Sequence, residues 1–312
     1  MTVEDPKVAE LPSMMRTRGW ADYGLIDTGN GRKLERYGRF TVVRPEPQCL
    51  WDPALAPEVW EAADAVFDPT DEEDAGRWKL QGHPGTGGPW PLAWGEAKFN
   101  GRFTSFRHLA FFPEQAANWE WLDAAVRGAA KSAEGAQPRV LNLFGYTGVA
   151  SLVMAAAGAA VTHVDASKRA VGWARENAEL SSLGDRPIRW ITEDARKYVQ
   201  REVRRGSKYE GIILDPPKYG RGPDGEVWRL FENLPELAGL CAELLSENAK
   251  FMVLNAYAER ISGAALSGLL ADKLKGRGGT IEWGELALVQ EDGAREIGMS
   301  FFARWQAEGR QG

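Results

Sequence analysis

The sequence between residues 139 and 218 alternates short apolar runs with longer segments of helical period. Three of the apolar runs, Val140–Phe144, Ala160–Val164 and Tyr209–Leu214, draw mainly on Val, Ile and Leu, and Val149–Ala157 between them has helical spacing. Short apolar runs that alternate with helical segments are typical of βαβ units, whose parallel strands are buried on both faces. The pattern therefore predicts an α/β fold with a parallel sheet.

The same alternation continues toward the C-terminus. Val227–Leu245 and Ile261–Lys275 have helical spacing, and Phe251–Asn255 between them has the composition of a buried strand. Thr280–Val289 and Ile297–Trp305 flank a Glu-Asp-Gly turn and predict a terminal antiparallel pair. The element count fits a doubly wound sheet of seven strands.

The first third of the chain has a different character. Two extended arms flank a Thr-Gly-Asn-Gly turn at residues 28–31, and the region after these arms is dominated by glycine, proline and tryptophan, including a Gly/Pro loop at 82–91. Asparagine and glycine favour the positive φ of tight hairpin turns. We therefore expect a flexible tail over residues 1–19, a small β-rich domain over 20–108 that could bind substrate, and a sheet domain over 109–312.

Two features at the ends of the predicted strands suit a nucleotide-like ligand. The first strand runs into Gly145-Tyr146-Thr147-Gly148, and the second ends in Asp165. A glycine turn lets the backbone approach a ligand closely, and an acid after the second strand can accept hydrogen bonds from ribose hydroxyls. The dinucleotide fingerprint G-x-G-x-x-G is absent, which disfavours an NAD-dependent oxidoreductase but leaves it open.

The strand Tyr209–Leu214 ends in an unusual turn, Asp215-Pro216-Pro217-Lys218-Tyr219. Two consecutive prolines cannot extend a strand, so they fix a stiff turn with few N–H groups at the carboxyl edge of the sheet. The carboxylate of Asp215 and nearby carbonyl oxygens can then accept hydrogen bonds from an amine. Such a turn suits holding a planar N–H donor beside an electrophile.

Four stretches, NLFGYTG, HVDAS, TEDA and DPPKYG, together resemble class I S-adenosylmethionine-dependent methyltransferases. Within that class the chain is similar to the bacterial enzymes that methylate bases of large-subunit ribosomal RNA and to their uncharacterised relatives. The resemblance covers roughly Asp22 to Gln306. It implies a Rossmann-like seven-stranded sheet, S-adenosyl-L-methionine as cofactor and an RNA substrate.

The resemblance also implies roles for individual residues. The implied cofactor-binding residues are Gln115, Asn142, Phe144, Gly145, Tyr146, Thr147, Gly148, Asp165, Ala166, Ser167, Asp194 and Ala195. The implied catalytic residues are those of the proline turn, Asp215, Pro216, Pro217, Lys218 and Tyr219. One departure matters, because the cytosine-C5 enzymes of this branch carry a cysteine after the fifth strand, where this chain has LNAYAER.

The charge of the chain limits how it could contact nucleic acid. A net charge of −6 argues against a protein that coats nucleic acid nonspecifically, since phosphate affinity comes from Lys and Arg. Two interpretations stay open for five basic residues, a local basic patch or solvated positions on strands: Arg32, Lys33, Arg36, Arg39 and Arg44. The tryptophans of the same region could stack unpaired bases or fill a small core.

The cysteines and the N-terminus bear on location. Cys49 and Cys241 are too few for a disulfide framework and lack metal-ligand spacing, so we expect no metal site and a reducing cytoplasm. No apolar run approaches the ~20 residues of a membrane helix, and residues 1–12 do not read as a leader. Monomer and homodimer both remain open.

The expected function is methyl transfer from S-adenosyl-L-methionine to a base nitrogen of RNA, with ribosomal RNA favoured. Carbon 5 of cytosine needs a cysteine thiolate, and neither cysteine has a suitable setting, whereas an amine needs only positioning. A methyltransferase that acts on a small molecule or a protein is the main alternative. A non-catalytic RNA-binding relative is disfavoured because Asp165 and the proline turn are both intact.

Overall fold

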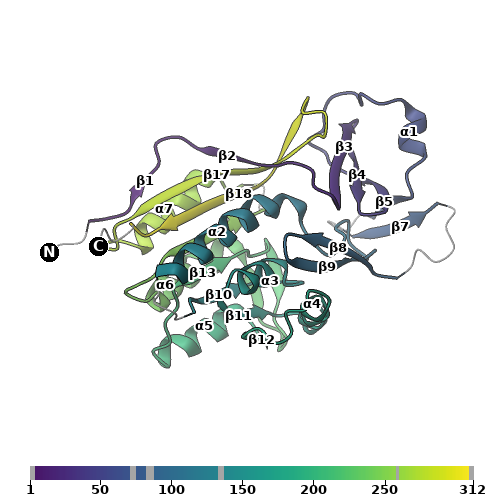
Figure 1. Cartoon of the computed structure of the whole chain (residues 1–312). Helices are drawn as coiled ribbons and strands as arrows, with labels where there is room; N and C mark the ends of the chain where they lie inside the picture. The colour runs from purple at the N-terminus through teal and green to yellow at the C-terminus, as the bar shows by residue number, and fades with distance from the viewer. Residues whose placement is uncertain (1–3, 71–74, 82–87, 133–136, 258–259, 309–312) are drawn as a thin grey trace. The chain divides into compact units, whose positions relative to one another are not determined.

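The computed structural model describes residues 4–70, 75–81, 88–132, 137–257 and 260–308 (Figure 1). Contacts within the chain divide it into two compact units. The larger unit contains residues 1–15, 118–286 and 300–312, and the smaller unit contains residues 16–117 and 287–299. Each unit is therefore assembled from stretches that are distant in the sequence.

The larger unit is built on one sheet with a parallel centre. The strands β12, β11, β10, β13 and β16 run parallel to one another, and β18 is antiparallel to β16. The order across the sheet is β1 (Lys7–Val8), β17 (Thr280–Val289), β18 (Glu296–Gln306), β16 (Phe251–Ala256), β13 (Gly211–Leu214), β10 (Arg139–Leu143), β11 (Ala160–Asp165) and β12 (Ile188–Thr192). The seven strands from β17 to β12 confirm the predicted doubly wound sheet.

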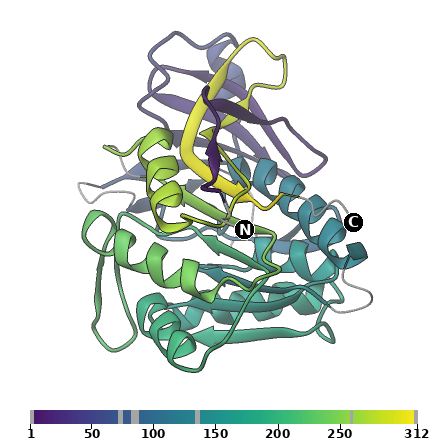
Figure 2. The ribbon, with the colours of Figure 1, turned by 90° about the vertical axis from the view of Figure 1, so that its left-hand side faces the viewer.

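Helices cover both faces of this sheet. Alternate residues of β10 belong to different apolar clusters, since Leu141 and Leu143 pack with one set of helices and Val140 packs with another. The first set is α5 (Ala195–Arg204), α6 (Leu230–Leu244) and α7 (Gly263–Lys273), and α6 and α7 lie side by side (Figure 2). The second set includes α2 (Ala116–Ser132) and α3 (Val149–Ala156), and α3 contacts α4 (Lys168–Leu180).

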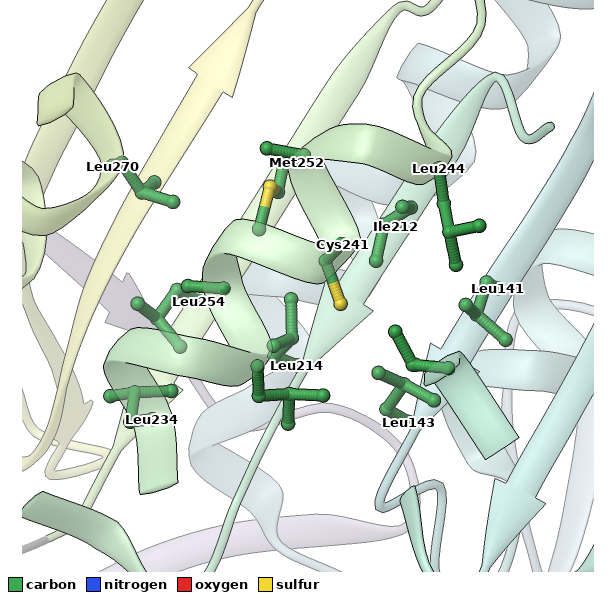
Figure 3. Close-up of a cluster of buried hydrophobic side chains, with 14 of the residues drawn as sticks. Leu141, Leu143, Ile212, Leu214, Leu234, Cys241, Leu244, Met252, Leu254 and Leu270 are labelled. Atoms are coloured by element: carbon green, nitrogen blue, oxygen red, sulfur yellow. The ribbon is translucent and has the colours of Figure 1, made fainter. Parts of the chain in front are cut away.

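The first cluster also explains the environment of Cys241. Its thiol lies among Leu141, Ile212, Leu214 and Leu244, which come from β10, β13 and α6 (Figure 3). Cys241 has no exposed surface, and burial raises the pKa of its thiol above the ordinary value. The cysteine is therefore part of the apolar core, as its position in the sequence pattern indicates.

The N-terminal segment differs from the expected flexible tail. The strands β1 and β2 (Ser13–Thr17) both pair with β17, and the N–H groups of Lys7 and Ala9 donate to Gly279 O and Ile281 O over 2.9 and 2.8 Å. The sheet thus has nine strands instead of seven, and the tail prediction is wrong for the described residues from 4 onward. An edge strand offers unpaired backbone groups that a short segment can satisfy without a strong pattern of its own.

The smaller unit is rich in β-structure, as expected. Its main sheet has the strand order β3 (Tyr23–Gly29), β4 (Arg32–Tyr37), β5 (Phe40–Pro45), β6 (Ala65–Pro69) and β7 (Gly76–Leu80). A helix, α1 (Pro57–Glu61), and a hairpin of β8 (Trp90–Trp94) and β9 (Ala97–Gly101) complete it. The unit also includes residues 287–299 of the terminal pair, which the expected range of 20–108 omits, and residues 82–87 of the expected Gly/Pro loop lie outside the described residues.

Two of the basic residues in this unit are buried. Arg44 donates from Nε and Nη2 to the Glu35 carboxylate over 2.7 and 2.8 Å, and Lys33 Nζ lies 3.5 Å from Glu46. Burial alone would raise the pKa of Glu35, but Arg44 and Lys33 lower it to about 2. Lys33 and Arg44 therefore lie neither in an exposed basic patch nor at solvated strand positions, so both interpretations are wrong for these two residues. Arg32 and Arg39 are exposed.

Two tryptophans among the described residues of the smaller unit lie in its core. Trp60 and Trp90 are 6% and 2% exposed, and their indole N–H groups donate to Asp27 Oδ2 and Tyr37 O over 3.1 and 3.0 Å. Buried indoles are stable when their N–H finds an acceptor, as it does at both positions. The core-filling interpretation is correct for these two residues, which are not available to stack on bases.

Candidate active site

The glycine turn comes directly after β10 and leads into α3. Phe144, Tyr146 and Gly148 have φ values of 57°, 47° and 84°, so the backbone turns sharply through the left-handed region. Gly145 N donates to Val164 O over 3.1 Å, which ties the turn to the end of β11. Gly148 is the N-cap of α3 and supplies no side-chain cap, so the turn presents helix N–H groups at the carboxyl edge of the sheet.

A chain of buried polar side chains lies against this turn. A Cβ on residue 145 would fall 2.5 Å from both Nδ1 and Cε1 of His163, so only glycine fits there. Ser151 Oγ lies 3.0 Å from His163 Nδ1 and accepts a hydrogen bond from Asn142 Nδ2 over 2.9 Å. Burial lowers the pKa of His163 to about 3, so the imidazole is neutral.

These buried hydrogen bonds include the side chain of Asn142. The resemblance implies that Asn142 binds the cofactor; in the structure its amide nitrogen donates to Ser151 and the residue is 2% exposed, so its part in cofactor binding stays a prediction. His163 and Ser151 were not predicted. The available signal is that Ser151 is a polar residue in the otherwise apolar segment Val149–Ala157 and that His163, next to Thr162, interrupts the apolar run Ala160–Val164.

Asp165 joins the glycine turn to the end of β11. Its Oδ2 accepts a hydrogen bond from Tyr146 N and its Oδ1 accepts one from Ser167 N, each over 2.8 Å. Burial raises the pKa of this carboxyl, while the two N–H groups oppose the shift. Each carboxylate oxygen keeps a second lone pair, so Asp165 can still accept hydrogen bonds from two neighbouring hydroxyls. Ala166 lies between Asp165 and Ser167 in the sequence.

Asp194 and Ala195 lie at the end of the next strand. Asp194 is the N-cap of α5 and accepts a hydrogen bond from Lys197 N over 3.0 Å. Glu193 N donates to Asp165 O over 3.1 Å, which holds this corner against the end of β11. Thr147 of the glycine turn is fixed from a further side, because its carbonyl oxygen accepts a hydrogen bond from Asn177 Nδ2 over 2.9 Å.

The proline turn after β13 is anchored by a hairpin that the sequence did not predict. β14 (Tyr219–Arg221) and β15 (Val227–Arg229) pair antiparallel, so the helix expected from Val227 begins only at Leu230. Trp228 Nε1 donates to Pro217 O over 2.7 Å. The Trp228 ring also lies 4.9 Å from the ring of Phe144, so the proline turn and the glycine turn share one contact residue.

The sheet order brings most of the predicted residues to one edge. Neighbouring strands β13, β10, β11 and β12 end in, respectively, the Asp215 turn, the glycine turn, Asp165 and the Asp194 corner. Asp215 N lies 3.4 Å from Leu143 O in the adjacent strand. Gln115 belongs to the smaller unit, and its part in the site stays a prediction. Pro216 is buried, whereas Pro217, Lys218 and Tyr219 are exposed.

These residues fit the chemistry of S-adenosylmethionine. A carboxylate with free lone pairs suits the two ribose hydroxyls, and a glycine turn backed by His163 leaves room for close approach of a ligand.

Within the described ranges, no group of three or more His, Cys, Asp or Glu side chains is arranged to hold a metal ion. No helix among the described residues has the length and apolar character needed to span a membrane.

Comparisons with known proteins give a consistent result. A family model described as conserved hypothetical protein 95 matches residues 116–254. The chain is similar to the crystal structure of a SAM-dependent methyltransferase from Agrobacterium tumefaciens, with 49% identity, a TM-score of 0.91 and coverage of 98% of this chain and 96% of that one. A putative SAM-dependent methyltransferase from Streptococcus mutans shares the fold, at 17% identity and a TM-score of 0.69 over 92% of this chain and 75% of that one.

Among curated proteins, the matches are to segments of larger chains. Ribosomal RNA large subunit methyltransferase K/L of Shewanella frigidimarina is 35% identical over 118 residues, which are 37% of this chain and 16% of that protein. Ribosomal RNA large subunit methyltransferase I of Aeromonas hydrophila is 39% identical over 94 residues, or 30% of this chain and 23% of that protein. The matched part thus spans less than a quarter of either curated relative.

Proposed function

The chain belongs to the S-adenosylmethionine-dependent methyltransferases, and from that premise we propose that it methylates a base nitrogen of RNA, with ribosomal RNA as the favoured substrate. The names of the curated relatives support ribosomal RNA as the substrate class. Because those relatives match over only part of their length, the substrate assignment rests mainly on the chemistry of the site.

The observation that carries the proposal is the anchored proline turn. Asp215 comes immediately after β13, and the turn is held by the hydrogen bond from Trp228 to Pro217 O. A carboxylate and a carbonyl oxygen in a fixed turn can accept both hydrogens of an exocyclic amine and so orient the nitrogen lone pair. Tyr219 is 50% exposed and can stack on a base that has left its helix.

The positions of the remaining residues suggest their roles. Bound S-adenosylmethionine supplies a methyl group on a positively charged sulfonium, so no strong acid or base is required from the protein. Asp165 would hold the ribose hydroxyls, and the turn Gly145–Gly148 would lie against the methionine part. The Asp194 corner would border the adenine. The protein thus contributes position and exclusion of water.

The absence of a suitable thiol favours nitrogen over carbon as the methyl acceptor. Cys49 belongs to the smaller unit, where burial raises the pKa of its thiol to about 11, and Cys241 lies within the apolar core. Methylation of cytosine carbon 5 needs a thiolate that adds to the ring first. An amine or a ring nitrogen needs no covalent step.

The proposal extends to the smaller unit and to the location of the protein. We assign residues 20–108 a role in substrate binding and place the enzyme in the cytoplasm with its RNA. Monomer and homodimer remain equal alternatives for the assembly.

The direct test is transfer of a tritiated methyl group into RNA purified from cells that lack this protein, with subsequent nucleoside analysis. We expect a single N-methylated nucleoside with the wild type and much slower formation of it with an Asp215→Ala variant that still binds cofactor. Label that appears in the protein or small-molecule fraction instead of RNA would overturn the substrate assignment. A methyl group on a base carbon would overturn the proposed role of Asp215.

A further inference from the structure

The hairpin after the proline turn has one face directed away from the core. Tyr219 pairs opposite Arg229, and Arg221 pairs opposite Val227, and residues paired directly across antiparallel strands share a face. Gly220 and Trp228 lie on the other face, and Trp228 is 3% exposed. We call Tyr219, Arg221, Val227 and Arg229 the outer face of the hairpin.

The outer face is held in a fixed position relative to the catalytic turn. Trp228, on the inner face of the hairpin, donates to Pro217 O over 2.7 Å, and Leu230 N donates to Lys218 O over 3.0 Å. The first bond holds Trp228, in the middle of β15, and the second holds Leu230, the residue that follows β15. Side chains of the outer face begin at Tyr219, four residues after Asp215.

The arginines of the outer face are not used by the fold. Arg221 is exposed, and its side chain makes no hydrogen bond or ion pair with any residue in the described ranges. The Arg229 side chain reaches only Glu232, at 3.4 Å, and both side chains are at least 60% exposed. An exposed pair of this kind contributes little stability.

The acids at the tip of the hairpin pair with a lysine and not with these arginines. Glu226 and Asp224 both pair with Lys197, which lies on α5. The outer face thus carries the guanidinium of Arg221, and that of Arg229 in its exposed pair with Glu232, beside an exposed aromatic ring. The net charge of the chain is −6. Val227, 42% exposed, adds an apolar surface between them.

We propose that the outer face of the hairpin binds the RNA strand next to the target base, with Arg221 and Arg229 contacting phosphates of the flanking nucleotides. The inference rests on the proposed function, because it assigns the substrate contacts of the same site. Cations interleaved with an aromatic and an apolar side chain fit a single-stranded nucleic acid, whose phosphates and base faces they can contact together. The fixed hairpin would set the register of the strand relative to Asp215.

The test compares an Arg221→Gln, Arg229→Gln variant with the wild type on protein-free ribosomal RNA from cells that lack this protein. We expect KM for RNA to rise roughly tenfold with kcat and the cofactor Kd unchanged. The slope of log Kd against log salt should fall by about 0.7 for each lost phosphate contact on a single strand. Lysine at both positions should restore most of the slope.

Arg204→Gln is the matched control. Arg204 is also exposed and without a partner in the described ranges, and it lies at the C-terminal end of α5, which leads back to the opposite edge of the sheet. Each glutamine removes one positive charge. If KM and the salt slope change more per charge in the hairpin variant than in Arg204→Gln, the position of the arginines and not the net charge causes the change.

The outcomes separate the two proposals. If the wild type methylates this RNA but the hairpin variant keeps the wild-type KM and salt slope, the outer face does not bind RNA and only this inference falls. An equal effect per charge with Arg204→Gln would also overturn it. An effect of the hairpin variant that is present with assembled ribosomal particles and absent with protein-free RNA would overturn it in favour of a protein partner. If the wild type methylates no RNA, the proposed function falls together with the inference.

Discussion

The backbone N–H of Tyr146 donates to Asp165 Oδ2 over 2.8 Å, so the acid assigned to the ribose also fixes the turn assigned to the methionine part of the cofactor. We expect Asp165→Ala to weaken S-adenosylmethionine binding by about 1–3 kcal/mol, because it removes a charged acceptor and frees the turn. Titration calorimetry measures this directly. Asp185→Ala, an exposed acid in the same unit, is the control and should bind normally.

The pH dependence of this binding provides a second measurement. Burial raises the pKa of Asp165, and a protonated carboxyl accepts hydrogen bonds less well. Cofactor affinity should therefore fall as the pH is lowered toward that pKa, and this fall should be absent in Asp165→Ala. An unchanged dissociation constant in the folded alanine variant would move the ribose contact to another residue.

Asp215→Ala should separate binding from turnover. Its proposed partner is the amine of the substrate, so the cofactor Kd should stay at the wild-type value while kcat falls about 100-fold through loss of orientation. Steady-state kinetics with RNA, together with calorimetry, measures both quantities. Joint loss of cofactor binding and activity would instead make the turn part of the cofactor pocket.

Gly145→Ala tests the close packing behind the glycine turn. The added methyl group would lie 2.5 Å from the His163 ring, which is buried and cannot move aside without breaking its contact with Ser151. We expect a loss of about 1–3 kcal/mol in stability and clearly weaker cofactor binding. Gly172→Ala is the matched control, since that glycine lies in α4 with nothing within 4 Å, and it should stabilise the helix slightly.

A variant without thiols should remain active. Burial raises the pKa of both cysteines, to about 11 for Cys49, so neither is a thiolate at neutral pH. Cys49→Ser combined with Cys241→Ala should therefore keep the wild-type kcat in the RNA assay. A folded but inactive double variant, or a covalent adduct with RNA that contains 5-fluorocytosine, would show that a cysteine attacks the base.

The smaller unit should lose stability in acid through Glu35. Its pKa is lowered from 4.5 to about 2 in the folded state, where burial is outweighed by Arg44 and Lys33. The resulting stability is fully present above pH 4.5 and is lost as the pH falls toward 2. Urea unfolding at several pH values should show this loss in the wild type and not in Glu35→Gln.

Glu35→Gln should also cost about 3–5 kcal/mol at neutral pH, because it leaves the buried Arg44 with an incomplete partner. Glu61→Gln, at an exposed position on α1, is the control. If Glu35→Gln shows the same pH dependence as the wild type, the acid sensitivity lies in other carboxyl groups.

The strands of the parallel sheet could be predicted because their sequences carry the signal locally. Val140–Phe144 is apolar throughout except at Asn142, which is typical of a strand buried on both faces, and the ends of such strands necessarily gather at one edge. The glycine turn, Asp165 and Asp215 were therefore found together from the sequence alone.

The features that were missed depend on partners in other strands and turns. The need for glycine at residue 145 comes from His163, and the burial of Arg44 depends on Glu35 in the neighbouring strand. The hairpin after the proline turn has strands of three residues each, too short for a periodic pattern, and Trp228 holds it by a tertiary hydrogen bond. Tertiary contacts of this kind decide short segments whose own preference is weak.

The division into two units has a consequence for how this enzyme can be altered. The chain crosses between the units four times, next to residues 15, 117, 286 and 299, and all four crossings fall inside β2, α2, β17 or β18. A small unit joined by two loops could be exchanged as a cassette, as inserted domains often are. Here every junction would sever a strand or a helix. A hybrid that acquires the smaller unit of a relative must therefore match strand register at three splice points and helix phase at the fourth, which favours changing substrate preference by point substitution.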